Sequence, residues 1–185
     1  MMKVRMRTTL AAVALLFAGL VAHRAEAATA AEIETQVNAA LKRCYAEVTG
    51  CKELANRAKG MLVFPEVTKA GVGIGGSYGV GALRVGGKTH GYYQTTSASI
   101  GLQLGAEKHS EVILFLTEQA LSDFRASSGW EVGGDAGVAV IDQGASKDID
   151  TLSGKEPVVA YIFGEKGLMG SLSLEGSKIE AYEPK

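Results

Sequence analysis

Glycine recurs at nearly every second position between residues 71 and 81, and this pattern constrains the fold more than any other feature of the chain. Five of the six glycines take odd positions, while most even positions carry larger side chains, namely Val72, Ile74, Tyr78 and Val80. Successive side chains of a β-strand point to opposite faces, so the pattern predicts a strand with one nearly bare face. Residues 97–106 repeat it. A bare face either lets a helix or a second sheet approach closely or permits sharp coiling of a small sheet.

Composition indicates a globular chain in which glycine serves the backbone geometry. Glycine accounts for 24 of the 185 residues, about twice the usual share of ~7%. The three prolines are too few for collagen or a proline-rich linker. Hydrophobic residues make up 46% and charged residues 21%, which excludes a disordered chain.

The first 27 residues have the layout of a secretory signal peptide. Three basic residues precede an apolar run over residues 10–22, and Ala25 and Ala27 give the small-x-small cleavage pattern. The run is shorter than the ~20 residues that a transmembrane helix needs, and a retained membrane anchor is the alternative. No cysteine lies near the cleavage site. We therefore expect an exported, soluble protein that is not a lipoprotein, and a periplasmic one in a double-membraned bacterium.

Residues 28–185 then form the mature protein, whose length is typical of one domain. The formal net charge is −1, and removing four basic residues and one acidic residue with the signal brings it to −4. A surface that binds nucleic acid needs clustered Lys and Arg side chains, so this charge argues against a nucleic-acid partner.

Cys44 and Cys51 are expected to form a disulfide in an oxidising compartment. One continuous helix would separate their Cα atoms by roughly 10.5 Å, which is too far for a bridge. Gly50 lies between them, and glycine commonly ends a helix. A helix ending near Val48, a tight turn and a second helix from Cys51 would bring the two cysteines together. Two buried free thiols are the alternative.

Apolar periodicity predicts three helices. Residues 31–48 carry apolar side chains at three- and four-residue spacing, and a short second helix follows over residues 51–59. Thr117 is expected to cap a third helix over residues 118–127, with Leu121 and Phe124 on its inner face.

The remaining apolar runs predict an antiparallel sheet. A short buried strand over residues 61–64 is expected to stop at Pro65, and Gly86 and Gly87 predict a hairpin turn. A second hairpin at residues 107–110 should lead into a buried central strand over residues 111–116. Later elements are expected as strands at 130–141, 157–163 and 168–174, a polar surface loop at 142–156 and a turn at 164–167.

Two short glycine motifs lack the context that their chemistry requires. Residues 71–76 match G-x-G-x-x-G and residues 75–79 match G-x-S-x-G, but both motifs need a helix directly after the turn. Here the sequence continues as a strand. A ribose-binding acid is also missing about 20 positions on, and no Ser–acid–His order can be assembled after Ser77. We interpret Ser77 as a small residue on the glycine face.

No metal or catalytic centre is predicted from the remaining polar residues. His90 and His109 have no partner at metal-ligand spacing and are interpreted as solvated loop residues. Asp142, Asp148 and Asp150 lack the pattern of a calcium loop and are interpreted as part of the solvated surface. The sequence gives no positive argument for an enzyme or for a cofactor.

Longer motifs connect the chain to a known family. Residues 60–79 (GMLVFPEVTKAGVGIGGSYG) resemble the SYLF family of lipid-binding domains, also described as the yeast actin-regulator (Las-binding) type. The resemblance covers nearly the whole mature chain, from about Ala31 to Tyr182. It continues through residues 91–93 (GYY), 97–103 (SASIGLQ), 124–129 (FRASSG) and 167–177 (GLMGSLSLEGS).

The resemblance implies a non-enzymatic domain that binds lipid, with phosphoinositides as the ligands of eukaryotic members. Lipid and actin contacts of those members are attributed largely to an N-terminal helical extension, whose place the signal peptide takes here. The first mature helix lacks the basic face that attracts anionic membranes. We therefore expect membrane lipid or another apolar ligand of the bacterial envelope. The alternative is a structural or stress-related envelope module that binds a protein.

The predicted fold is one α+β domain over residues 28–185. N-terminal helices and one mid-chain helix pack on a strongly curved, Gly-rich antiparallel sheet or small barrel. If basic side chains steer the protein to lipid headgroups, the candidates lie at predicted turns or strand ends, where side chains can reach a surface. They are Lys69, Arg84, Lys88, Lys108 and Lys166.

Overall fold

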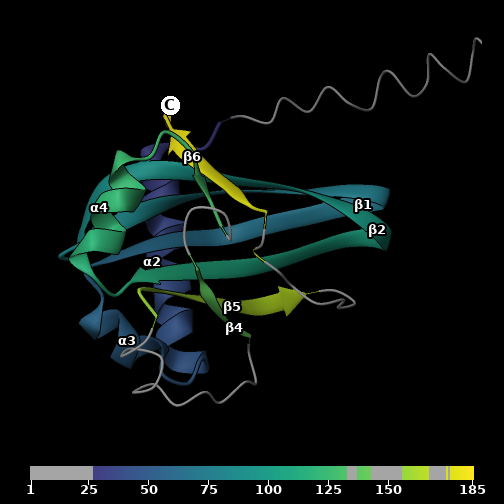
Figure 1. Cartoon of the computed structure of the whole chain (residues 1–185). Helices are drawn as coiled ribbons and strands as arrows, with labels where there is room; N and C mark the ends of the chain where they lie inside the picture. Colours follow the sequence, from purple (N-terminus) through teal and green to yellow (C-terminus); the bar gives the residue numbers. More distant parts are fainter. Residues whose placement is uncertain (1–26, 133–136, 143–155, 167–173, 175) are drawn as a thin grey trace, which may run out of the picture.

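A computed structural model describes residues 27–132, 137–142, 156–166, 174 and 176–185 of the chain. Two long strands, β1 (Gly60–Val85) and β2 (Lys88–Phe115), form an antiparallel hairpin that runs the length of the molecule (Figure 1). Helices α2 (Ala30–Glu47) and α3 (Cys51–Arg57) precede the hairpin, and α4 (Glu118–Ala126) follows it. The shorter strands are β3 (Trp130–Glu131), β4 (Ala139–Asp142), β5 (Val158–Lys166) and β6 (Lys178–Tyr182).

β1 doubles back so that its two halves lie in direct backbone contact. A β-carbon at Gly79 would stand 2.9 Å from the carbonyl oxygen of Glu66, and one at Gly81 would collide with the carbonyl oxygen of Val63. Only glycine fits at such distances. The bare face predicted from the alternation therefore allows the close approach of a second layer, which here is the other half of the same strand.

The bend itself lies between Gly71 and Gly75, whose backbones are also too close for a side chain at Gly71. β2 follows the bend alongside β1 with a shift in register. Val72 pairs with Leu104 and Ile74 with Ile100, so β2 uses three residues where β1 uses one. The strand on the outside of a bend has the longer path, and a bulge of this kind supplies the extra length.

The predicted turn at Gly86 and Gly87 is confirmed. Their φ angles of 56° and 78° lie in the left-handed region, as the two-residue turn of a tight hairpin requires. From this turn, where Val85 pairs with Lys88, the two strands stay paired to the far end, where Gly60 pairs with Phe115, with three shifts of register along the way.

The sheet is mixed rather than purely antiparallel. Its strands follow the order β3-β6-β2-β5-β4, with β1 paired to β2. β4 runs parallel to β5, so the expectation of an antiparallel sheet is wrong for this pair, while the other pairs in the described residues are antiparallel. The α+β class and the packing of three helices on a strongly curved sheet are confirmed.

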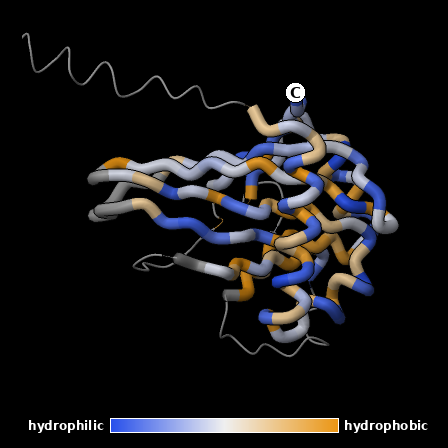
Figure 2. Tube along the Cα trace, turned by 180° about the vertical axis from the view of Figure 1, so that it is seen from behind, coloured by the Kyte–Doolittle hydropathy of each residue, from blue (hydrophilic) through white to orange (hydrophobic). Residues whose placement is uncertain are grey.

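Helices cover both faces of the sheet where β1, β2 and β5 lie side by side. Val63, Leu114 and Tyr161 face the core beneath α2 and α3, whereas Phe115 and other alternate residues face the core beneath α4. Phe124 of α4 anchors the second core, with its ring centroid 4.9 Å from that of Phe115. Figure 2 shows hydrophobic residues crowded at this end of the molecule.

The three helices match their predicted positions closely. Thr29 begins α2 with a capping box, because its hydroxyl accepts from the Glu32 amide while the Glu32 carboxylate accepts from the Thr29 amide. Thr117 caps α4 as predicted, accepting from the Ala120 amide at 3.1 Å. None of the helices in the described part of the chain is long and apolar enough to cross a membrane.

Two predicted interruptions of the sheet are wrong. β1 continues through Pro65, which lies in a register shift between Phe64 and Val67. Proline is tolerated at such a bulge because no ladder hydrogen bond needs its missing N–H. β2 likewise runs through residues 107–110 without a turn, so the strand predicted over 111–116 is the end of β2. That end is buried between β1 and β5, as expected for a central strand.

The C-terminal part departs further from the prediction. The strand expected over residues 130–141 is reduced to β3 and β4, and β5 passes through Gly164 without turning back. β6 was not predicted at all. The signal peptide, the strand expected at 168–174 and the loop at 142–156 lie outside the described residues, apart from Ala27, Asp142, Glu156 and Leu174.

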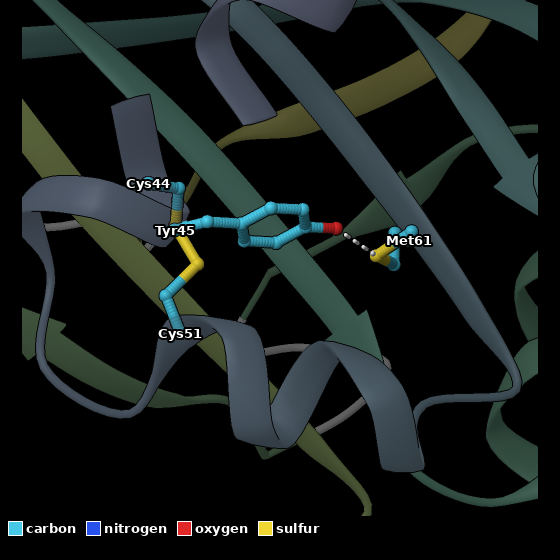
Figure 3. Close-up of a disulfide and its surroundings, with 4 residues drawn as sticks. All are labelled: Cys44, Tyr45, Cys51 and Met61. Atoms are coloured by element: carbon cyan, nitrogen blue, oxygen red, sulfur yellow. Dashed lines mark hydrogen bonds between the residues drawn. A yellow bond between two sulfur atoms is a disulfide. The ribbon is translucent and has the colours of Figure 1, made fainter. Parts of the chain in front are cut away.

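The predicted disulfide between Cys44 and Cys51 is confirmed (Figure 3). α2 ends at Glu47, and Gly50 with φ of 81° lets the chain reverse into α3. The Cα atoms of the two cysteines are then 6.0 Å apart, and both residues are fully buried. The bridge therefore locks two helices that are joined by a short turn.

Gly81→Ala should destabilise the protein by roughly 1–3 kcal/mol, because the added methyl forces the two halves of β1 apart. The urea midpoint of unfolding measures this loss. Gly137→Ala is the matched control, since a β-carbon there would meet no atom within 4 Å. Equal stability of the Gly81 variant and the wild type would contradict the close contact.

Reduction of the disulfide should lower the free energy of unfolding by roughly 2–3 kcal/mol, the value for a loop of this length. Urea unfolding with and without a reductant measures the effect. A Cys44→Ala/Cys51→Ala variant should not respond to the reductant. Two thiols that titrate in the denatured, unreduced protein would show that the bridge is not formed.

Candidate functional site

Because the β1–β2 hairpin is folded back at its bend, the candidate headgroup cations lie toward opposite ends of the molecule. Lys69, Lys108 and Lys166 lie near the bend of β1, where Lys108 is the register partner of Lys166 and also pairs with the neighbour of Lys69 in β1. Arg84 and Lys88 lie beside the two-residue turn at the other end. The sheet therefore brings three of the five candidates together.

The expectation that Arg84 reaches a surface is wrong. The residue is only 9% exposed, and its Nη2 donates to the Glu34 carboxylate at 2.6 Å and to the Asn38 side-chain oxygen at 2.9 Å. Both partners lie on α2, which covers this end of the hairpin. Arg84 therefore ties α2 to β1 instead of meeting a ligand.

Glu34 also accepts hydrogen bonds from two side chains of β2. Thr89 and Tyr92 both donate hydroxyl hydrogen bonds to its carboxylate. Burial raises the pKa of the Tyr92 hydroxyl, and its hydrogen bond to the Glu34 carboxylate raises it further. Such a network fixes the position of α2 on the hairpin, because a partly buried carboxylate is stabilised by several donors around it.

Lys108 and Lys69, near the bend, are closer to solvent than Arg84. Lys108 forms an ion pair with Glu66 at 2.6 Å, and both side chains are 54% exposed. An ion pair with this exposure is worth about 0–1 kcal/mol, so Lys108 can exchange Glu66 for another anion at little cost. Lys69 is half-buried opposite Glu107, while Lys88 at the other end is exposed.

Beyond these lysines the hairpin continues as an arm, defined here as residues 70–78 of β1 and 96–106 of β2. The arm contains no Asp, Glu, Lys or Arg, and it extends past the helices at one end of the molecule (Figure 1). Two of the large hydrophobic side chains that are exposed in the described residues lie on it. Ile74 is 74% exposed and Tyr78 is 49% exposed.

The arm is a two-stranded ribbon in the described part of the chain. β6 pairs with β2 as far as Thr96, and β5 pairs with β2 only from Lys108 onward. Between these limits, within the described residues, each strand of the arm has ladder partners only in the other strand. Ser77 and Ser97 join across the ribbon through their hydroxyl oxygens at 2.7 Å and hold its register. Ser77 lies within a continuous strand, where no helix follows it.

His109 is not the solvated loop residue that the sequence suggested. The predicted hairpin around it does not exist, so His109 lies within β2 at 5% exposure. Its Nε2 donates to the Glu111 carboxylate at 2.8 Å, and Glu111 is equally buried. Nδ1 of His109 and Oε2 of Glu111 have no hydrogen-bond partner among the residues that the structure describes. Polar residues spaced by two along an unrecognised strand were the missed signal.

This pair lacks the geometry of a catalytic triad. Ser110 lies between the two residues and therefore points to the opposite face of the strand. Its hydroxyl donates to the Pro65 carbonyl oxygen at 2.7 Å and accepts from the Arg43 guanidinium at 2.8 Å. The described residues also contain no group of three His, Cys, Asp or Glu side chains that could hold a metal ion.

His109→Leu should destabilise the protein by about 3–5 kcal/mol, because it leaves the buried Glu111 carboxylate without its partner. The double variant His109→Leu/Glu111→Met removes both polar groups and should recover most of this loss. Urea unfolding of the wild type, both single variants and the double variant measures the coupling. Additive losses in the double variant would contradict a coupled buried pair.

Comparison with known proteins agrees with the family suggested by the sequence motifs. Residues 96–184 match the family model Ysc84, described as Las17-binding protein actin regulator. The match begins in β2 and runs past β6, and it includes the motif segments at 97–103, 124–129 and 167–177. The search of curated proteins found no match. Through residues 96–184 the chain belongs to the Ysc84 family, which is the SYLF type of domain.

Proposed function

We propose that the protein is an exported, non-enzymatic, lipid-binding protein of the bacterial cell envelope. The family match over residues 96–184 carries the proposal, because the family is described by lipid-binding and actin-regulator roles and not by a reaction. A lipid is the ligand class that an exported member of such a family can meet in a bacterial envelope.

Two features support export. The first 27 residues have the layout of a secretory signal, with basic residues, an apolar run and small residues at the cleavage position. The buried bridge between Cys44 and Cys51 is of a kind that forms and persists in oxidising compartments such as the periplasm.

The placement of the lysines supports a preference for anionic lipid. Lys69, Lys108 and Lys166 come together beside the bend of β1, next to an arm that carries no charge. Lysines close to an anionic membrane surface each add to the attraction. Glu66 and Glu107 lie among them and reduce this attraction, so we expect the preference to be several-fold rather than absolute.

A protein partner in the envelope is the second candidate function. The family description itself names binding to a protein. Native mass spectrometry separates the two candidates, because a lipid-binding protein should carry co-purified lipid from the expression host, whereas a protein-binding module should show the mass of the chain alone.

Flotation with vesicles tests the proposed function directly. The full chain is expressed with its own signal, purified from the exported fraction and mixed with phosphatidylcholine vesicles or with vesicles that also contain phosphatidylglycerol. We expect flotation with both, and tighter binding to the anionic vesicles that weakens between low and physiological salt. Failure to float with either kind would overturn lipid-bilayer binding. An intact signal in the exported protein's mass would overturn the cleavage site.

The lysine cluster is tested by the variant Lys69→Gln/Lys108→Gln/Lys166→Gln. It should lose the several-fold preference for anionic vesicles and keep its binding to zwitterionic ones. The control Lys42→Gln/Lys52→Gln/Lys185→Gln changes the net charge equally at exposed positions away from the bend. If both triple variants lose the same amount, the net charge of the protein sets the preference and the cluster does not.

A further inference from the structure

The arm departs from the way in which proteins normally protect a projecting pair of strands. Open strand edges are usually guarded by charged side chains, most often lysine, because they otherwise pair with other chains. Here the charge-free stretch is longer than the arm itself. It spans residues 70–83 of β1 and residues 91–106 of β2. Such a surface is suited to contact with an environment of low polarity, in which burying a charged side chain is unfavourable.

One apolar row connects the arm to the core. Ile74, Tyr78, Val80 and Ala82 occupy even positions of β1 and therefore share one face. Ala82 is fully buried beneath α2, and Val80 packs against the same core. Tyr78 is half-exposed and Ile74 is largely exposed. The row thus leaves the cover of the helix and ends at the bend with its largest aliphatic side chain in solvent.

We propose that the end of this arm is the membrane-contacting element of the protein, with Ile74 entering the interfacial region of a lipid bilayer. The inference rests on the proposed lipid-binding function and assigns the part of the chain that makes the contact. Tyr78 lies on the same face behind Ile74, where its ring meets the headgroup level, which is the preferred depth of tyrosine. The three lysine positions follow at the base of the arm, where headgroup phosphates lie.

The backbone limits how deeply the arm can enter. In the described part of the chain the outer edges of the ribbon carry no ladder partners over residues 97–106 of β2. Unpaired N–H and C=O groups cost several kcal/mol each in hydrocarbon, so an open ribbon cannot cross the apolar interior. It can rest in the hydrated interface, where water and headgroups satisfy these groups. We therefore expect shallow insertion at the bend.

A double substitution tests the arm. Ile74→Ser/Tyr78→Ser should weaken binding to both zwitterionic and anionic vesicles about tenfold, because it removes the apolar contact and leaves the lysines in place. Tyr45→Ser is the matched control, because Tyr45 is exposed to 36% on α2, away from the arm. The control should bind within twofold of the wild type. All replaced side chains are exposed, and equal urea midpoints verify that the variants fold.

The variant Ile74→Trp reports the position of the arm independently of affinity. On binding to vesicles its additional fluorescence should shift to shorter wavelength and be quenched by phosphatidylcholine brominated near the headgroup end of its acyl chains. Trp130 is buried in the core and supplies a constant background that the wild type measures.

The outcomes separate the two proposals. If the wild type floats but the double variant floats equally well and Trp at position 74 is unaffected, the arm is not the contact, while lipid binding stands. If the wild type does not float, both proposals fail. If sedimentation shows concentration-dependent dimers that the double variant abolishes, with no vesicle contact at position 74, a second copy covers the arm and the membrane inference is overturned.

Discussion

The backbone contact between the two halves of β1 is the constraint on which the other parts of the structure depend. Gly81 lies against the Val63 carbonyl and Gly79 against that of Glu66, so one strand supplies two layers. Because β2 follows β1 around the bend, the pair forms a strongly curved sheet without any additional strand. Its two faces then accept α2 and α3 on one side and α4 on the other.

The same bend creates the arm. Two strands of 26 and 28 residues are longer than the helices can cover, so the part nearest the bend stands beyond them. At the two-residue turn, Arg84 and Glu34 fasten the hairpin to α2 through a partly buried ion pair. The folded hairpin is therefore fixed to α2 by partly buried polar contacts near its turn, and at its bend it faces the surroundings with uncharged residues.

The sequence was sufficient for features that depend on local patterns. Helical periodicity, the cap at Thr117, the turn at Gly86 and Gly87 and the disulfide all follow from residues close together in the chain. The course of the sheet could not be predicted from local patterns. Proline normally ends a strand, and only the long-range register shows that Pro65 lies in a bulge. β6 is short and has charged residues at positions 178 and 180, so its sequence resembles a loop until its pairing with β2 is known.

The residues of the candidate site also differ in whether local sequence patterns or long-range contacts determine their surroundings. Lysine positions could be chosen from predicted turns, but the burial of Arg84 depends on Glu34 and Asn38, about 50 residues earlier in the chain. The burial of His109 depends on whether residues 107–110 form a turn, and that prediction was wrong. In contrast, the absence of charge over residues 70–83 and 91–106 was visible in the sequence, and only the position of the bend gave it a meaning.

The long hairpin also sets the order in which the chain can fold. Val85 and Lys88 are neighbours across a two-residue turn, whereas Gly60 and Phe115 are joined only after all 54 residues between them have been brought into register. Closing a short loop loses much less chain entropy than closing a long one, so pairing is favoured to begin at Gly86 and Gly87 and to advance away from them. The bend must then form before residues 60–64 find their places, and the helices can dock only on the completed layers. Although Gly60 and Phe115 are distant in the sequence, each step of this pairing joins residues that the previous step has already brought close together.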